Sequence, residues 1–288
     1  MQARFFPWLD RSGRLSALKL AVFAALFVPA AWIAVQSEIG RIGTVKAAVH
    51  EAGLWAIRIL LVSLAVSPLR RIAGWNKLIV VRRMLGVAAL FYVLAHFALY
   101  IVEDGFDLSL VAGEIVRRLY LAVGFAALLG LAALGATSTD AAIRRLGPGR
   151  WNRLHALVYA IAVLALVHDM LQAKLDIGDQ LLLLGLFLLL MGWRLLARFK
   201  LGEDPVAIAG LAVAATAVTA LFEAGWYHVR NGIDVAAVLA ADVSLDDGLR
   251  PVWFVLVAGF AAVALRCARP LWSRKGPSSA RRLRAAVR

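Results

Sequence analysis

Three histidines of this sequence lie in long apolar segments, where an ionisable side chain is costly. His155 and His168 are thirteen residues apart, and His96 lies in an earlier apolar segment. Thirteen helical residues rise about 20 Å, so His155 and His168 would lie near opposite faces of a membrane. Ionisable residues in such positions indicate a functional site with a bound partner.

The spacing of the histidines from charged residues sets their expected depths. His96 follows Arg82 and Arg83 by fourteen and thirteen residues, which is close to the spacing between His155 and His168. If both segments begin at the same membrane face, His96 and His168 share a depth near the outer face. Two neutral imidazoles from facing helices can bind haem b iron, one on each side. The sequence therefore predicts a haem site at His96 and His168, with core histidines bonded to backbone carbonyls as the alternative.

The inner level of His155 is less complete. Thirteen residues of straight helix would point His155 and His168 about 140° apart, so they cannot bind the same iron. They could serve two stacked sites only if the helix bends or the two haems are approached from different sides. Arg82 and Arg83 share the depth of His155 but are unsuitable iron ligands. Their guanidinium groups would suit haem propionates, a flavin phosphate or a quinone oxygen. Ordinary flanking charge of a membrane helix explains the two arginines equally well.

Three further arginines are expected near the outer face. Arg58 lies inside an apolar segment, and Arg117 and Arg118 open another. They could neutralise the propionates of a haem at the outer level, or they could extend to lipid head groups. His50 and His228 lie in or beside expected outer loops and are interpreted as ordinary polar surface residues.

The composition is that of a membrane protein. Of the 288 residues, 62% are hydrophobic and 17% are charged, and the mean hydropathy is +0.79; soluble domains carry about 25% charged residues. We predict an all-α integral membrane protein, a helical bundle of about eight transmembrane helices. The expected spans are approximately 15–35, 54–69, 84–101, 115–136, 151–171, 181–196, 206–224 and 251–267.

The charges indicate an orientation. With alternating spans, one side collects 24 of the 32 Lys and Arg residues and 4 of the 18 acidic residues. Positive loops stay cytoplasmic, so both termini are predicted to be cytoplasmic and the acidic loops to face outward. Orientation explains the net charge of +14, and a nucleic-acid partner is not expected. The basic tail at 281–284 is expected to bind lipid head groups.

Other chemistry is limited by what the sequence lacks. The single cysteine, Cys267, excludes an internal disulfide and a Cys-x-x-Cys-His attachment site, so a haem would be held by ligation alone. No glycine-rich phosphate loop or Rossmann signature is visible. The chain is therefore not expected to carry a nucleotide-binding domain.

Several blocks of the sequence, in consistent order over about residues 15–200, resemble the MsrQ (YedZ) family. The blocks are 54–56 with 67–71, 82–86 leading to His96, Arg118-Leu119-Tyr120 with Gly124, and a final, most distinctive set. That set comprises 137–139 with 145–147, Arg150-Trp151, Leu154-His155, Val158-Tyr159 and His168. Leu119 departs from the family, which commonly has proline at this position.

The resemblance implies a subunit of a larger system. The family belongs to the ferric-reductase-like membrane superfamily, and its ligand histidines correspond to His96, His155 and His168. It implies a bacterial inner-membrane protein with one or two b haems and FMN as a further cofactor. Electrons would come from the quinone pool or a cytosolic flavin reductase and pass to a periplasmic molybdopterin methionine-sulfoxide reductase (MsrP-like). The chain itself is not expected to be the catalytic subunit.

Residues 1–200 are interpreted as a six-helix haem-binding domain. Residues 201–288 would then be an extension with two further spans and a basic cytoplasmic tail. The extension includes an outer loop, 231–251, whose apolar run at 235–239 could dock a partner or form a lid. Two alternatives to the electron-transfer subunit stay open. The first is a stand-alone ferric or metalloreductase, and the second is a haem-free transporter or assembly factor.

Overall fold

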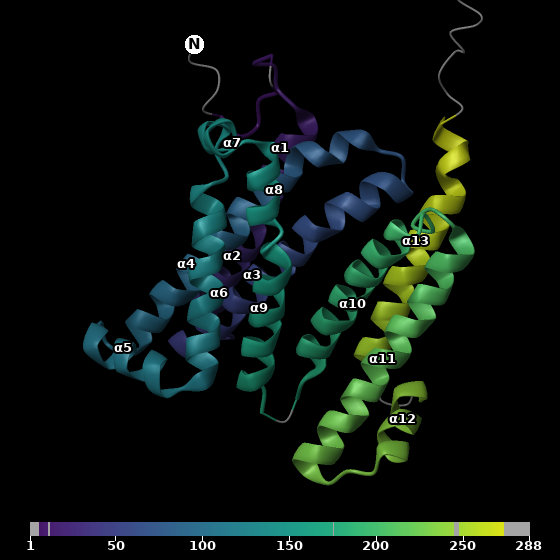
Figure 1. Cartoon of the computed structure of the whole chain (residues 1–288). Coiled ribbons are helices and arrows are strands. Elements are labelled where there is room, and N and C mark those ends of the chain that lie inside the picture. Colours follow the sequence, from purple (N-terminus) through teal and green to yellow (C-terminus); the bar gives the residue numbers. More distant parts are fainter. Residues whose placement is uncertain (1–5, 11, 175, 245–247, 274–288) are drawn as a thin grey trace, which may run out of the picture. The chain divides into compact units, whose positions relative to one another are not determined.

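The computed structural model describes residues 6–10, 12–174, 176–244 and 248–273 (Figure 1). These residues form thirteen α-helices, one 3-10 helix and an isolated bridge between Leu9 and Leu15. Apolar membrane segments fold this way because a helix satisfies every backbone polar group within itself. The prediction of an all-α fold is confirmed.

Eight helical segments among the described residues are long and apolar enough to cross a membrane, which confirms the predicted number of spans. The span predicted to begin at residue 115 begins instead at Leu119, because a separate short helix, α5 (Leu108–Arg117), precedes it. The orientation of the termini stays a prediction. The eight segments are Ala17–Glu38, Val45–Ile72, Asn76–Glu103, Leu119–Ala136, Pro148–Gln172, Gly178–Arg198, Pro205–Asn231 and Pro251–Leu271.

The chain divides into two compact units. The first unit comprises Met1–Leu64 and Val80–Leu183, and the second comprises Ala65–Ile79 and Leu184–Arg288. The division passes through two α-helices, α3 (Val45–Ile72) and α10 (Gly178–Arg198), and through the 3-10 helix η1 (Asn76–Val81). The sequence analysis predicted a different division, into two consecutive domains that meet near residue 200. That domain boundary stays a prediction.

The first unit holds all eight predicted site residues. Its helices are α1 (Ala17–Ala25), α2 (Val28–Glu38), the first part of α3, α4 (Arg82–Glu103), α5, α6 (Leu119–Ala136), α7 (Asp140–Leu146), α8 (Pro148–His155), α9 (Val158–Gln172) and the start of α10. Helix α6 packs along α9 and also contacts α4 and α5 (Figure 1). Leu54 and Leu64 of α3, Ala89 of α4 and Ala162 of α9 are almost completely buried.

Two of the predicted spans are broken. In the first, α1 and α2 are separated at Leu26–Phe27, close to Pro29. The hydroxyl of Tyr92 accepts a hydrogen bond from the backbone N–H of Ala30 and donates one to the carbonyl of Leu26. In the other, α8 ends at His155 and α9 begins at Val158. The second break lies between His155 and His168, so the two histidines stand on separate helices rather than on one straight helix.

The second unit contains the end of α3, residues 76–79 of the 3-10 helix, and most of α10. It also contains three further helices: α11 (Pro205–Asn231), α12 (Val235–Val243) and α13 (Pro251–Ser273). Helix α11 packs along α13 and contacts α12. The α11–α13 approach is close at Gly259, where a Cβ atom would lie 2.3 Å from that of Ala212. Small residues commonly allow such close packing between membrane helices. The apolar run predicted at 235–239 lies in α12, with Val238 buried.

Candidate functional site

His96 of α4 and His168 of α9 lie side by side in the first unit. Their ring centroids are 6.3 Å apart, and the ring planes are inclined by 82°. A metal–imidazole nitrogen bond is about 2 Å long, so two imidazoles on opposite sides of one metal have centroids about 6 Å apart. The observed separation would therefore allow both imidazoles to bind a single metal.

In both histidines, Nδ1 is engaged in a hydrogen bond and Nε2 is available to bind a metal. Nδ1 of His96 lies 2.7 Å from the carbonyl oxygen of Val49, and Nδ1 of His168 lies 2.8 Å from that of Tyr120. Because a carbonyl oxygen can only accept, each Nδ1 carries the hydrogen and donates it. In the neutral imidazole, Nε2 is then the nitrogen that can bind a metal.

A glycine lies against each ring. Gly53 follows Val49 by four residues, and a Cβ atom at Gly53 would lie 3.0 Å from Nδ1 of His96. Gly124 follows Tyr120 by the same interval, and a Cβ atom there would lie 2.6 Å from Nδ1 of His168. The two imidazoles are thus held in the same way, each packed against a glycine of a neighbouring helix.

Both histidines line a cavity of about 940 Å³ within the first unit. This volume lies near the upper end of the range for small-molecule and cofactor sites. Its apolar lining includes Leu60, Phe97, Leu128, Leu131 and Ile161. Charged lining residues gather toward one set of helix ends, with Lys46 and Asp179 near the starts of α3 and α10, Glu103 and Lys174 near the ends of α4 and α9, and Arg118 before α6. The other charged lining residues are acidic: Asp104, Glu114, Asp169 and Asp176.

The donor set favours a metal inside a planar organic ligand. Within the described ranges, no group of three or more His, Cys, Asp or Glu side chains is placed to hold a metal ion. Two imidazoles alone are too few for the usual protein metal sites, which take four or more ligands. A macrocycle such as the predicted haem b supplies the remaining ligands itself. The apolar walls of the cavity suit its ring, and the cationic side chains suit its propionates.

The three outer arginines occupy different surroundings. Arg118 lines the cavity, forms an ion pair with Glu114 and donates a hydrogen bond to the hydroxyl of Tyr120. The guanidinium of Arg58 lies 2.8 Å from Asp179 and over the ring of Trp55. Nε of Arg117 donates to the carbonyl of Gly113 in its own helix. Neither Arg58 nor Arg117 is among the residues that line the cavity, so Arg118 is the best placed of the three for a propionate.

His155 lies outside this cavity lining and has its own neighbours. Its Nε2 is 3.2 Å from the hydroxyl oxygen of Thr137, and its ring stacks on Trp151 with centroids 3.8 Å apart. The indole N–H of Trp151 donates to the carbonyl of Thr137. Arg82 and Arg83 begin α4, and the exposed Arg83 forms an ion pair with Asp140. The structure therefore separates His155 from the other two histidines.

Several lining residues had no assigned role in the sequence analysis. Asp169 is buried beside His168 and accepts a hydrogen bond from Gln180. Lys46 and Lys174 add cations near the cavity, and His50, expected on the surface, is exposed but also lines it. In each case the glycine follows the residue with the bonded carbonyl by four positions. The sequence alone could not link these pairs to their histidines, because Val49 is 47 residues from His96 and Tyr120 is 48 residues from His168.

The membrane helices and the paired histidines define a multi-pass membrane protein of the ferric-reductase type. The family model described as "Ferric reductase like transmembrane component" matches residues 52–166. The chain belongs to the family of the protein-methionine-sulfoxide reductase heme-binding subunit MsrQ.

Three relatives illustrate the similarity. The chain is 41% identical over 189 residues to MsrQ of Rhodospirillum rubrum, covering 65% of this chain and 88% of the relative. It is 41% identical over 200 residues to MsrQ of Xanthomonas campestris, covering 66% and 91%. It is 36% identical over 192 residues to MsrQ of Azospira oryzae, covering 65% and 82%. No solved structure matches the chain.

Proposed function

We propose that this chain is a membrane subunit that transfers electrons through b-type haem to a methionine-sulfoxide reductase. The observation that carries the proposal is the pair His96 and His168, with ring centroids 6.3 Å apart in a shared cavity. Its relatives bear the name heme-binding subunit of protein-methionine-sulfoxide reductase, which supports the same cofactor here.

In this proposal, Nε2 of His96 and Nε2 of His168 would hold the haem iron. The carbonyls of Val49 and Tyr120 fix the rings and increase the basicity of the ligand nitrogens. Haem b, when bound, supplies reversible one-electron transfer. The apolar lining at Leu128 and its neighbours excludes water, and Arg118 offers paired donors to a carboxylate.

Electrons would enter at the helix ends that carry Arg82, Arg83 and His155. The guanidinium groups suit a quinone oxygen or the phosphate of FMN, which supports the quinone pool or a cytosolic flavin reductase as donor. His155 would hold a second cofactor at this level. The stacking of Trp151 on His155 and the contact with Thr137 would keep the imidazole in place.

Electrons would leave at the opposite helix ends, where the acidic residues gather. Glu103, Asp104 and Glu114 line the cavity there, and the charge distribution of the sequence favours the outer face of the bacterial inner membrane for this end. A periplasmic MsrP-like subunit would accept the electrons and carry out sulfoxide reduction. The acidic rim would then contribute to recognition of that partner.

Optical spectroscopy of the purified chain tests the proposal. We expect Soret and α bands typical of haem with two imidazole ligands, and loss of this signal in His96→Ala and in His168→Ala. His228→Ala is the control, because His228 is an exposed residue of the second unit that contacts the carbonyl of Ile233. A well-expressed wild-type protein without haem bands would favour the transporter or assembly-factor alternative. Rapid discharge of the reduced chain onto a soluble ferric chelate, without any protein partner, would favour a metalloreductase.

A further inference from the structure

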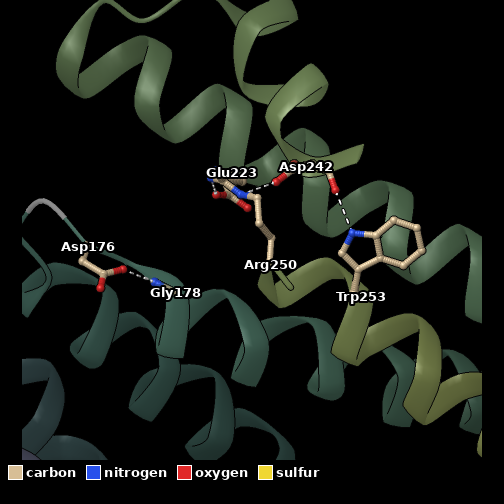
Figure 2. A network of polar contacts seen from close by, with 6 residues as sticks. All are labelled: Asp176, Gly178, Glu223, Asp242, Arg250 and Trp253. Atoms are coloured by element: carbon tan, nitrogen blue, oxygen red, sulfur yellow. Dashed lines mark hydrogen bonds and ion pairs between the residues drawn. The ribbon is translucent and has the colours of Figure 1, made fainter. Parts of the chain in front are cut away.

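The second unit contains a buried cluster of two carboxylates and one guanidinium. Glu223 lies on α11, Asp242 lies near the end of α12, and Arg250 immediately precedes α13. The Glu223 and Asp242 side chains are 2% and 5% exposed, and that of Arg250 is 27% exposed. Nη2 of Arg250 lies 2.6 Å from Oε1 of Glu223, and Nε lies 2.9 Å from Oδ1 of Asp242 (Figure 2).

The charges of this cluster do not balance if both carboxylates are ionised. One guanidinium would then face two negative charges in a buried position. Among the described residues, Oε2 of Glu223 and both carboxylate oxygens of Asp242 have no hydrogen-bond donor; Oδ1 has only the ion pair with Arg250. Buried carboxylate oxygens without donors are costly, which favours the binding of one more positive species in the cluster.

The surroundings favour a proton over a metal ion. Among the described residues, the charged and titratable groups facing the cluster are Glu223 and Tyr227 from α11, Asp242 from α12, and Arg250 from the segment before α13. Trp253 of α13 donates its indole N–H to the main-chain carbonyl of Asp242 and does not titrate. Calcium takes six to eight oxygen ligands, whereas this cluster offers two carboxylates and already contains a cation.

We propose that Glu223 and Asp242 form a proton-binding site, in which one shared proton neutralises the second negative charge and holds α12 against α11 and α13. A carboxyl group that carries the proton can donate it to the neighbouring carboxylate, which satisfies two of the orphaned oxygens at once. Burial and the adjacent Glu223 carboxylate raise the pKa of Asp242 to about 6. Above that pH the proton is lost, the two carboxylates repel each other, and α12 loosens.

Infrared difference spectroscopy of the full-length protein in detergent detects this proton directly. We expect a protonated-carboxyl C=O band that disappears as the pH rises, with a midpoint near 6. Because one proton is shared, the band should be missing in both Glu223→Gln and Asp242→Asn. Glu203→Gln is the matched control, because Glu203 also pairs with an arginine, Arg269 at 2.6 Å, but is 48% exposed. A band that survives in both variants overturns the proposal.

Hydrogen exchange provides a second measurement. After correction for intrinsic rates, the amides of α12 should exchange faster at about pH 8 than at about pH 5 in the wild type, and equally slowly at both in Asp242→Asn. If the wild type shows no pH-dependent carboxyl band and added Ca²⁺ slows amide exchange in α12, the cluster is instead a cation site. If neither variant accumulates in the cell, the pH titration of the carboxyl band in the wild type decides whether the proton is bound. These measurements do not depend on haem content, so they are independent of the proposed electron transfer.

Discussion

Gly124 leaves the surface of α6 bare against the ring of His168, where a Cβ atom would lie 2.6 Å from Nδ1. We therefore expect Gly124→Ala to displace the ring from the Tyr120 carbonyl and to abolish or strongly weaken six-coordinate haem. Gly53→Ala should have a smaller effect, because the corresponding distance to His96 is 3.0 Å. The haem-to-protein ratio and the optical spectrum measure both effects. Gly86→Ala is the control, since a Cβ atom there would meet nothing within 4 Å beyond its own stretch of helix backbone. Loss of haem from this variant would point to a general effect on folding.

The cavity position of Arg118 predicts an effect on the redox potential. Replacement by glutamine removes a positive charge near the site and should lower the haem midpoint potential, because reduction adds an electron. Arg58→Gln and Arg117→Gln should shift it less, since these side chains do not line the cavity. Spectroelectrochemical titration measures the three variants, and a larger shift for Arg58 or Arg117 would contradict the assignment of Arg118.

The separation of His155 from the other two histidines predicts two independent levels. His155→Ala should leave the signal of the His96/His168 haem intact and remove only a cofactor of the inner level. Thr137→Val should weaken that inner cofactor without removing it, because it deletes the hydroxyl 3.2 Å from Nε2 of His155. Haem and flavin quantitation gives the result. Equal loss of all haem from single alanine variants of the three histidines would indicate one shared pocket.

The bridge from Tyr92 to the α1–α2 break predicts a contribution to stability. Tyr92→Phe removes one hydrogen bond to the Ala30 N–H and one to the Leu26 carbonyl. With a net contribution of about 1 kcal/mol for each bond, the variant should lose roughly 1–3 kcal/mol. Denaturant unfolding in detergent micelles measures the loss. Phe91→Leu, at the exposed neighbouring position, should change the free energy of unfolding by less than about 0.5 kcal/mol.

The raised pKa of Asp242 predicts how stability depends on pH. The folded protein binds this proton more tightly than the unfolded chain does, because the pKa moves from 3.8 to about 6 on folding. The stabilisation is complete below the unfolded pKa and is lost as pH rises through the folded pKa. The thermal midpoint of the wild type should therefore fall between about pH 4 and about pH 6. Asp242→Asn should remove this part of the decline, and an identical decline in both proteins would contradict it.

Helix rise made part of the site predictable from the sequence. Because each residue advances the helix by a fixed distance, His96 and His168 could be placed at one depth, and the structure brings their rings together. Iron binding by this pair stays a prediction. The supporting carbonyls could not be foreseen, since Val49 and His96 are 47 residues apart and no local pattern links them.

The hydropathy pattern also failed to predict where some helices begin and end. Helix α3 runs over Val45–Ile72 rather than the predicted 54–69, because charged residues such as Lys46 and Glu51 extend it beyond the apolar run. Helix α5 was missed because it has ten residues, too few to span a membrane. The Glu223–Arg250 contact joins residues 27 apart across a connection whose path the sequence does not reveal.

The hydrogen bonds of the two histidines have a consequence for biogenesis. Each ring is carried by one helix and held by the backbone of another: His96 of α4 by α3, and His168 of α9 by α6. Four separately inserted segments must therefore assemble before the imidazoles adopt their final positions. Insertion into the bilayer would then precede porphyrin capture, and cells starved of porphyrin should still accumulate an assembled chain that can be reconstituted with haem afterwards.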